Sequence, residues 1–542
     1  IKKNLIAKNK YYQVDNSCRN DLQPIPSLFH TNKYKINKIA YGSYVLFNFN
    51  SSNINSFFIY KKGSQGLYYT LDENNNLHFS SDVYGLINKS DKFNVLKKEG
   101  IYKIDNKFRN NIKITSFKKT DLLTNDLSLK GKDTFFLKEI NDTDIFLKRT
   151  ILKYIDFKNR KIIGLDNLFN QKFKKKLKKK KIKNIIFTGM GSCYTSAVGI
   201  SKYLNSKIGE FGYNNIKIEA TIASEGSGFY LSNNMEDTII IVIAQSGTTI
   251  DTNVFAKMAK ERGAYTLAIV NKKQGDVTYI VDQSFYLGNG RDIEISVPST
   301  KTYTCHLIAG FILSEKIIEI LIEKTNYKFI NSLKEITYTD SVKQNLNILS
   351  QKINKLDFDV FKFNKWVVVY DDTFTSFTAL EFRVKLSECC YRSIPNLSLS
   401  QFNKIKFKNT LVFYLTSSPK IKKFDKSNFY IQTSGQKKSY RLKNCFHLNL
   451  RSANFISLVI ELSLSLQLIS YKIAKKIDLY AFDLLKLKKK ISYIKKFILD
   501  KKNLKTYEIL NHKKKLKFLQ EKLIRPIDVI KHQAKTITVG AI

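Results

Sequence analysis

Residues 238–249, with the sequence TIIIVIAQSGTT, decide the fold of this chain. The first seven residues of this stretch are apolar or β-branched and carry no charge, which predicts a strand buried on both faces. The segment QSGTT follows directly, and a helix is expected from there through Arg262. Similar runs at 184–188 and 266–271 predict two further buried strands. Because strands of this kind alternate with helices, the sequence predicts a parallel sheet covered on both faces.

The same alternation recurs later in the chain, whereas the start of the chain differs. Strands are expected at 366–370 and 411–415, with a helix near 376–391 and a long helix from about 454. Before residue 150, short aromatic and β-branched runs separated by Asn, Ser and Gly turns predict β-structure. The expected fold class is α/β, with two doubly wound parallel-sheet domains after a β-rich region. The expected domain boundaries are 1–145, 150–335 and 345–520, followed by a tail at 521–542.

The composition is that of a folded protein of 542 residues. Hydrophobic residues make up 43%, which excludes a chain that is disordered as a whole. The formal net charge is +46, but only 11 residues are Arg. Lys shares A/T-rich codons with the abundant Asn, Ile, Phe and Tyr, so genome composition accounts for the charge. Arg is the better reader of phosphates and bases, so its scarcity disfavours a nucleic-acid partner. The basic tract at 172–183 is expected to be a solvated helix face.

The cysteines and the apolar runs predict a cytoplasmic location. The six cysteines are scattered and form no CxxC pair, which favours a reducing compartment. No uncharged apolar run of about 18 residues occurs, so no membrane-spanning helix is expected. The run at 455–469 contains Glu461 and predicts a buried helix. The chain begins at Ile1 without a Met and stops at Ile542, and both ends are expected to be internal to a longer protein.

Hydroxyl-bearing side chains gather where the predicted strands pass into helices. Backbone N–H groups and the positive end of a helix make such a turn a cradle for a phosphate, and QSGTT at 245–249 offers both with three hydroxyls. Simple capping of the helix by Ser246 or Thr248 is the alternative. GMGS at 189–192 and VPSTK at 297–301 lie at two other predicted helix starts. The three turns together favour a phosphate site more than any one of them does.

These segments resemble a known family. GMGSCY at 189–194, AQSGTT at 244–249 and EISVPSTK at 294–301 resemble, in order and spacing, the first sugar isomerase (SIS) domain of the glutamine–fructose-6-phosphate aminotransferase family. Residues 379–388 resemble the catalytic helix of the second SIS domain, and 525–539 resemble the closing C-terminal loop. Parts of the chain between 42 and 82 look like the later portion of the family's glutaminase domain. The resemblance therefore implies two SIS domains after a partial glutaminase domain related to the N-terminal nucleophile hydrolases.

The resemblance implies a role for each matching residue. Glu388 would move a proton between C1 and C2 of fructose 6-phosphate, Lys385 would assist by proton donation, and Lys535 would form a Schiff base with the ketone carbon. A carboxylate three residues from an ammonium shares its helix face, so this pair is chemically coherent. An ordinary surface ion pair is the alternative for Lys385 and Glu388. The positions that would hold the sugar phosphate are Ser192, Cys193, Gln245, Ser246, Thr249, Val297 and Ser299.

The chain departs from the family pattern at several positions. Cys193 and Ala244 stand where the family usually has hydroxyls, and each loss weakens phosphate binding by about 0.5–1.5 kcal/mol. Lys404 stands at the spacing of the ring-opening histidine, and a lysine of ordinary pKa is a poor proton shuttle near pH 7. His447 or His532 could take over that role if the fold brings either one close.

The glutaminase nucleophile is missing from this chain. The family's glutaminase uses an N-terminal Cys whose α-amino group acts as the base, and position 1 is Ile. Asp21 is the residue that the resemblance matches to the acid gripping the glutamine amine. Residues 1–145 are therefore expected to be a partial glutaminase domain in a fragment, with the nucleophile upstream or in another chain.

Three readings of function follow. The first is an enzyme that forms glucosamine 6-phosphate from fructose 6-phosphate and glutamine or ammonia, as a homodimer and without a metal or organic cofactor. The second is a sugar-phosphate-binding sensor or a decayed enzyme, which the changes at Cys193, Ala244 and Lys404 favour. The third, binding of a polyanion, requires a basic stripe on one face, whereas the lysines are spread along the whole sequence.

Overall fold

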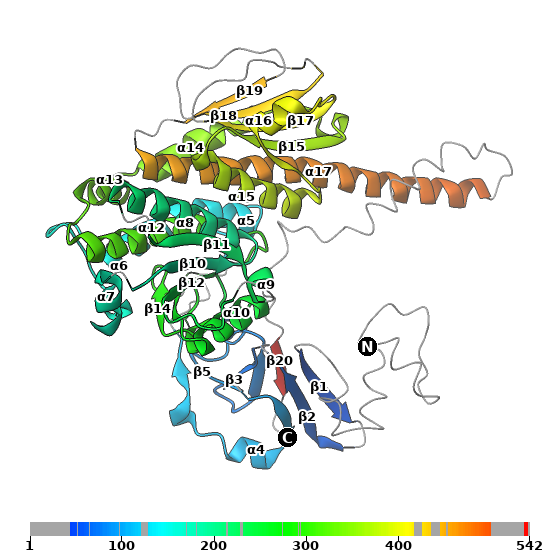
Figure 1. Cartoon of the computed structure of the whole chain (residues 1–542). Helices are drawn as coiled ribbons and strands as arrows, with labels where there is room; N and C mark the ends of the chain where they lie inside the picture. The colour runs from blue at the N-terminus through cyan, green and yellow to red at the C-terminus, as the bar shows by residue number, and fades with distance from the viewer. Residues whose placement is uncertain are drawn as a thin grey trace. The chain divides into compact units, whose positions relative to one another are not determined.

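The computed structural model describes residues 44–50, 53–63, 66–96, 98–120, 128–169, 171–179, 181–212, 215–227, 231–273, 275–290, 292, 294–416, 425, 427–434, 445–450, 454–499 and 536–539. These residues belong to two compact units (Figure 1). The first unit contains the described residues up to Ser128 together with 536–539, and the second contains those from Leu129 onwards to 499.

The first unit is built from antiparallel strands. One sheet has the order β1-β2-β6, with β1 (Tyr44–Asn50), β2 (Asn53–Lys62) and β6 (Gly100–Ile104). The other has the order β20-β4-β3-β5-β7, with β20 (Thr536–Val539), β4 (Leu77–Ser80), β3 (Tyr68–Leu71), β5 (Lys92–Val95) and β7 (Lys118–Lys119). Phe57, Tyr69 and Phe79 lie in the core shared by these strands. The predicted β-structure is confirmed for the described part of this region.

The second unit contains two parallel sheets of five strands each. The first has the order β11-β10-β12-β13-β14, with β10 (Asn184–Gly189), β11 (Lys217–Ile222), β12 (Thr238–Ala244), β13 (Tyr265–Val270) and β14 (Gln283–Tyr286). The second has the order β16-β15-β17-β18-β19, with β15 (Lys365–Tyr370), β16 (Asn396–Ser398), β17 (Thr410–Thr416), β18 (Phe429–Ser434) and β19 (Cys445–Asn449). The predicted α/β fold with parallel sheets is confirmed.

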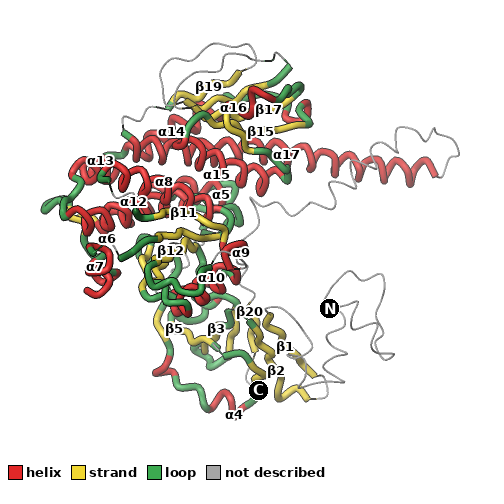
Figure 2. Tube along the Cα trace, viewed as in Figure 1, coloured by secondary structure: helices red, strands yellow, loops and turns green. Residues whose placement is uncertain are grey.

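Helices fill the space between the two sheets (Figure 2). The long ones are α8 (Ser192–Glu210), α12 (Lys301–Ile322), α13 (Tyr327–Tyr338), α14 (Ser341–Asn354), α15 (Thr373–Cys390) and α17 (Phe455–Leu499). α10 (Ile250–Glu261) and α16 (Leu399–Lys404) cover the outer faces of the first and second sheet respectively. The shorter helices of this unit include α5 (Phe135–Asn141), α6 (Thr143–Tyr154), α7 (Gln171–Lys178), α9 (Ala223–Glu225) and α11 (Val277–Ile280).

Alternation along the strands builds this layered arrangement. In β12, Ile239 and Ile241 face the inner helices, whereas Ile240 and Val242 face α10 on the other side of the sheet. Successive side chains of a strand point to opposite faces, so a continuous apolar run buries both of them. One hydrophobic core runs from the first sheet through the inner helices to the second sheet. The two predicted SIS domains therefore form one compact unit.

The boundary of this unit differs from the expected start at residue 150. The unit begins at Leu129, because α5 and α6 pack into its core through Phe136, Ile140, Phe146 and Leu147. The buried apolar side chains of these two short helices belong to the same hydrophobic core as the inner helices. Residues 129–149, which precede the expected start, thus belong to the α/β unit.

The N-terminal part of α17 lies in the protein core. Its stretch Phe455–Asp478 is long and apolar enough to cross a membrane, and among the described residues it alone has that length and composition. The window that meets this test is 78% buried inside the protein. Glu461 and Leu464 are among its buried residues. The prediction of a buried helix at 455–469 is therefore confirmed.

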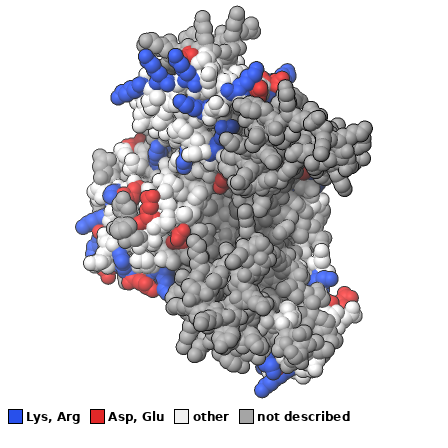
Figure 3. All heavy atoms as spheres, turned by 90° about the vertical axis from the view of Figure 1, so that its right-hand side faces the viewer, with Lys and Arg blue, Asp and Glu red and all other residues white. Residues whose placement is uncertain are grey.

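Charged side chains are interspersed on the surface. On the face drawn in Figure 3, the described Lys and Arg side chains lie in separate groups with Asp and Glu among them. In α7, Lys175, Lys176 and Lys178 lie in the last turn, as expected for the basic tract at 172–183. The described part of the face in Figure 3 offers no continuous basic stripe of the kind that polyanion binding requires.

Candidate active site

The topology brings two of the predicted phosphate turns to one edge of the first sheet. Counted along the chain, the strand order of this sheet is 2-1-3-4-5. Ligands of open α/β sheets bind at the carboxyl ends of the strands, where the order reverses, and that point lies here between β10 and β12. α8 begins with Ser192 directly after β10, and residues 245–249 follow β12. The two turns therefore flank the expected ligand position.

The turn at 245–249 is preformed. Gly247 has a φ of +71°, and a Cβ at this position would lie 2.9 Å from the Cα of Gly275, so only glycine fits without strain. Ser246 Oγ lies 2.8 Å from Thr248 Oγ1 and accepts the backbone N–H of Thr248 at 3.3 Å. These bonds shape the loop. Ser246 and Thr248 therefore stabilise the turn locally, and neither is the N-cap residue of α10.

Two side chains of this turn are left for a ligand. Thr249 is the N-cap residue of α10, but its hydroxyl makes no capping hydrogen bond, and the residue is exposed. Gln245 Oε1 is buried and has no hydrogen-bond partner among the described residues. Buried polar atoms are nearly always paired, so this oxygen is suited to a ligand hydroxyl or a water. The start of α10 supplies the positive helix end that favours an anion.

A buried polar cluster joins α8, which follows β10 of the first sheet, to α15, which follows β15 of the second sheet. Lys385 Nζ, from α15, donates to Ser192 Oγ at 2.8 Å and lies 3.0 Å from Glu388 Oε2 and 3.2 Å from Glu381 Oε1. Glu381 in turn accepts hydrogen bonds from Ser192 Oγ at 3.0 Å and from Thr195 Oγ1 at 2.5 Å. The predicted pair Lys385–Glu388 is thus confirmed as a contact, and Ser192 joins it from another domain.

The burial of this cluster rules out an ordinary surface ion pair. The side chain of Lys385 is fully buried, whereas that of Glu388 is 35% exposed. Burial alone would lower the pKa of Lys385, but the neighbouring carboxylates of Glu381 and Glu388 outweigh it and raise that pKa. Burial raises the pKa of Glu381 despite the nearby Lys385. Lys385 therefore stays an ammonium, and Glu388 is the carboxylate that a ligand can reach.

A second pair of buried carboxylates holds the loop before α12. Glu294 accepts the backbone N–H of Thr300 at 2.6 Å and the hydroxyl of Ser299 at 3.0 Å. Glu139, from α5, accepts the backbone N–H of Ile295 and both the N–H and the hydroxyl of Ser296. These bonds fix the segment that carries the predicted sugar-site residues Val297 and Ser299. Gln467 of α17 also donates to the carbonyl of Thr300 at 3.0 Å.

Glu139 is an unusual carboxyl group. Burial, followed by the negative charge of Glu294, raises its pKa to about 7, against the opposing effects of Lys301 and the hydrogen bond from Ser296. Thr300 Oγ1 lies within hydrogen-bond distance of both carboxyls, but it has only one proton to give. A protonated Glu139 relieves this conflict.

The remaining predicted residues lie in several places. Cys193 is half-buried at the start of α8, and Val297 is 37% exposed. Lys404 is exposed at the end of α16 and makes no hydrogen bond or ion pair with the described residues. His447 lies on β19, at the edge of the second sheet opposite to β16, and its Nδ1 is 3.8 Å from Cys445 Sγ. Asp21, His532 and Lys535 lie outside the described residues.

Sequence reasoning missed the buried partners of this site. Glu381, Lys385 and Glu388 are spaced four and three residues apart, which places all three on one face of α15, and this spacing could have revealed Glu381. No sequence signal marked Thr195 or Glu139, because their partners are distant in the chain. Among the described residues, no group of three or more His, Cys, Asp or Glu side chains is arranged to hold a metal ion.

Comparisons with known proteins agree with the geometry. A SIS domain model matches residues 176–313. The glutamine–fructose-6-phosphate aminotransferase [isomerizing] of Clostridium tetani is 32% identical over 44% of this chain and 36% of its own length. That of Bartonella quintana is 29% identical over 55% of this chain and 46% of its own length. The chain thus spans between about a third and a half of these relatives.

A solved structure shows the same fold. The C-terminal domain of glucosamine-fructose-6-phosphate aminotransferase from Francisella tularensis matches with a TM-score of 0.54 at 20% identity. The match covers 64% of this chain and 97% of that domain. The strand orders of the second unit, the SIS match and the related sequences agree with one another. The chain therefore contains a SIS domain and resembles the glutamine–fructose-6-phosphate aminotransferases.

Proposed function

We propose that this chain binds fructose 6-phosphate and isomerises it, as the sugar-converting part of an enzyme that makes glucosamine 6-phosphate. The observation that carries the proposal is the contact of Ser192, Lys385 and Glu388 at the ligand-binding edge of the first sheet. A buried ammonium between two carboxylates is costly to assemble, because each charge loses its hydration. Such a cluster at a sheet edge where ligands bind favours a catalytic role over a purely structural one.

The phosphate would occupy the turn after β12. Thr249, the start of α10 and the buried Oε1 of Gln245 offer a hydroxyl, backbone N–H groups and an acceptor for a sugar hydroxyl. Val297 and Ser299, on the loop held by Glu139 and Glu294, would line the sugar. Cys193 replaces a hydroxyl next to Ser192, so the phosphate relies more on the α10 turn than it does in relatives with a hydroxyl there.

The reaction needs one proton moved between adjacent carbons. Glu388 would remove a proton from C1 of the open-chain sugar and return it to C2, which leaves C1 as the aldehyde. Lys385, as a permanent ammonium, would stabilise the negative charge that develops on the sugar oxygen. This differs from the proton donation expected from sequence, because the raised pKa of Lys385 makes it a weak acid.

Amination would add the second half of the chemistry. Lys535 would condense with the C2 ketone and release water, and ammonia would then displace the lysine amine, so that C2 carries nitrogen when its proton arrives. Glutamine would supply the ammonia through a glutaminase to which residues 1–145 contribute. We further propose that the protein acts in the cytoplasm as a homodimer.

A sugar-phosphate-binding protein without turnover is the second candidate. The exposed Lys404, which makes no hydrogen bond or ion pair with the described residues, favours it, since a ring-opening group should face the substrate. Cys193 and Ala244 also favour a binding protein without turnover, because each stands where the family usually has a hydroxyl. This candidate shares the binding site with the enzyme and differs only in the fate of the bound sugar.

An assay of both reactions separates the two candidates. The chain is incubated with fructose 6-phosphate, with and without ammonium, and glucose 6-phosphate and glucosamine 6-phosphate are quantified. We expect turnover in the intact chain and its loss in Glu388→Gln and Lys535→Ala. Glu261→Gln, which breaks an exposed intrahelical ion pair with Lys257, is the matched control and should keep full activity. Saturable binding of the sugar without any product would instead establish the sensor.

A further inference from the structure

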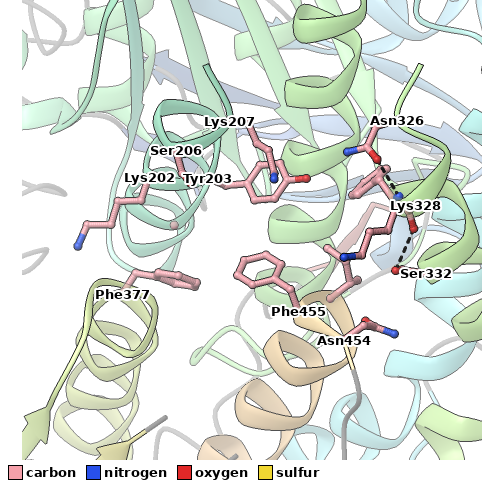
Figure 4. Close-up of a pocket in the computed structure, with 13 residues that line it drawn as sticks. Lys202, Tyr203, Ser206, Lys207, Asn326, Lys328, Ser332, Phe377, Asn454 and Phe455 are labelled. Atoms are coloured by element: carbon pink, nitrogen blue, oxygen red, sulfur yellow. Dashed lines mark hydrogen bonds between the residues drawn. The ribbon is translucent and has the colours of Figure 1, made fainter. Parts of the chain in front are cut away.

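A second pocket lies in the helical layer, away from the candidate active site (Figure 4). It has a volume of about 540 Å³, within the range of small-molecule sites. Its walls come from α8, from the segment around the start of α13, and from the first turns of α15 and α17. The side chains that matter for its chemistry are Lys202, Tyr203, Lys207, Lys328, Phe377 and Phe455.

Aromatic rings form the apolar part of the pocket. Phe377 enters from α15 and Phe455 from α17, on two sides of the cavity (Figure 4). The rings of Tyr203 and Phe455 stack with centroids 5.6 Å apart, and Phe455 is still 40% exposed. Tyr203 and Phe377 are buried, so Phe455 offers the exposed ring, which is suited to stacking against a flat apolar group.

The charges that line the pocket are all positive. Its lining includes three lysines and no Asp or Glu. Lys328 is exposed, and its ammonium makes no ion pair with the described residues. Half-buried Lys202 donates to the hydroxyl of Ser376 at 2.5 Å, and burial lowers its pKa. Lys207 is paired with Glu210, outside the lining, at 2.9 Å. Figure 4 shows Lys328 directed toward the ring of Phe455, so an anion in the pocket would meet an ammonium group without an ion-pair partner among the described residues.

The pocket is separate from the candidate active site but shares two helices with it. Along α8, Tyr203 lies about 16 Å from Ser192, at 1.5 Å per residue. On α15, Phe377 precedes Lys385 by about two turns. The helices touch closely between the two sites, since a Cβ on Gly199 would lie 2.8 Å from the ring of Phe377. A ligand in the pocket would therefore contact α8 and α15, the two helices that carry Ser192 and Lys385.

We propose that this pocket binds a second small molecule, one that joins a flat aromatic group to a phosphate. The aromatic group lies against the exposed ring of Phe455, and the phosphate meets Lys328. The binding site is distinct from the sugar site and goes beyond the proposed isomerisation. It does not depend on turnover, so its failure and the failure of the proposed function are separate results.

Calorimetric titration of the full chain tests this site, with 1-naphthyl phosphate as the probe. We expect it to bind at least about tenfold more tightly than 1-naphthol or inorganic phosphate, because each of these lacks one half of the recognition. Lys328→Gln and Phe455→Leu should each weaken binding about fivefold or more. Lys334→Gln, on the same helix but outside the pocket, and Phe211→Leu, an exposed Phe elsewhere, are the matched controls and should bind normally.

Three results would overturn the proposal. The first is no preference for 1-naphthyl phosphate over its two halves. The second is normal binding by both Lys328→Gln and Phe455→Leu. The third is loss of binding in Thr249→Val, which would place the probe at the sugar-phosphate turn instead. Lys328 is exposed and unpaired among the described residues, so its substitution leaves the fold intact, and a thermal melt of each variant checks this.

Discussion

Lys385 Nζ donates a hydrogen bond to Ser192 Oγ at 2.8 Å, although the two residues are 193 positions apart in the chain. Ser192 opens the first long helix of one SIS domain, and Lys385 lies in the second domain. The contact fixes α15 against α8 and places Glu388 at the edge where the first sheet offers its ligand site. A chain with only one of the two domains would lack this arrangement.

The buried cation of this contact should contribute strongly to the stability of the folded protein. Lys385→Met leaves Glu381 and Glu388 without their ammonium, and breaking a buried ion pair from one side costs about 3–5 kcal/mol. Urea denaturation of the variant measures that loss. Glu381→Gln added to Lys385→Met should restore part of the stability, because it removes one uncompensated carboxylate.

The exposed pair Lys257–Glu261 is the control for that experiment. Lys257→Met should change the free energy of unfolding by less than about 0.5 kcal/mol, as for most surface pairs. Equal losses in Lys385→Met and Lys257→Met would mean that the buried cluster does not form.

Glu139 should make stability depend on pH. A carboxyl whose pKa is raised from 4.5 to about 7 in the folded protein binds its proton more tightly there than in the unfolded chain. Its contribution to stability is therefore fully present below 4.5 and is lost as the pH rises through about 7. Urea titrations from about pH 5 to about pH 8 should show the loss, with a slope of up to about 1.4 kcal/mol per pH unit.

Glu139→Gln isolates this effect from other titrating groups. The amide keeps the shape of the side chain but cannot ionise, so the difference in stability between the two proteins should vary with pH over that window. A difference that is constant across the window would show that Glu139 does not titrate there.

Glu139 should also govern sugar binding through the loop that it holds. Removing its acceptor in Glu139→Ala frees the N–H groups of Ile295 and Ser296, and the loop with Val297 and Ser299 loses its anchor. We expect fructose 6-phosphate to bind about 5- to 20-fold more weakly, which corresponds to roughly 1–2 kcal/mol. Calorimetry gives the affinity, and Glu335→Ala on the exposed side of α13 should leave it unchanged.

Two glycines should respond in opposite directions to the same change. Gly247→Ala forces a side chain into a left-handed φ and toward Gly275, which should destabilise the protein by about 1–3 kcal/mol and impair the phosphate turn. Gly209→Ala, in α8 with open space around its Cβ, should stabilise it by about 0.5–1 kcal/mol. Thermal melts of both variants measure these changes. An unchanged melting temperature for Gly247→Ala would contradict the left-handed φ at this turn.

Central strands could be predicted from the sequence, and edge strands could not. β10, β12, β13, β15 and β17 were all expected, because continuous apolar runs mark strands buried on both faces. β11 has the sequence KIEATI and only partly buried side chains, so it lacks that signal. The edge strands β14, β16 and β19 were missed as well, and β14 and β16 are short. The inner strand β18, between β17 and β19, is the exception, because it was missed although it is not at an edge. At the edge of a sheet, a segment becomes a strand because it pairs with a neighbouring strand, and its amino-acid composition does not mark it.

The candidate site, too, could be predicted only where the contacting residues are close together in the sequence. Lys385 and Glu388 were expected as a pair because they share a helix face. Their burial depends on packing between α8, α15 and the Glu381 carboxylate, which local spacing does not encode. The role of Glu139 was likewise hidden, since Ser296 lies 157 residues from it. Contacts of that separation arise only when the chain is folded.

The most direct test of the account follows the proton that Glu388 is proposed to move. Fructose 6-phosphate is incubated with the full chain in D₂O, and proton NMR records the C1 proton of the ketose and the aldose signal of glucose 6-phosphate. We expect loss of the C1 signal or growth of the aldose signal with the intact chain, and neither with Glu388→Gln. An unchanged spectrum with sugar bound to the intact chain would contradict the isomerase and leave a binding protein.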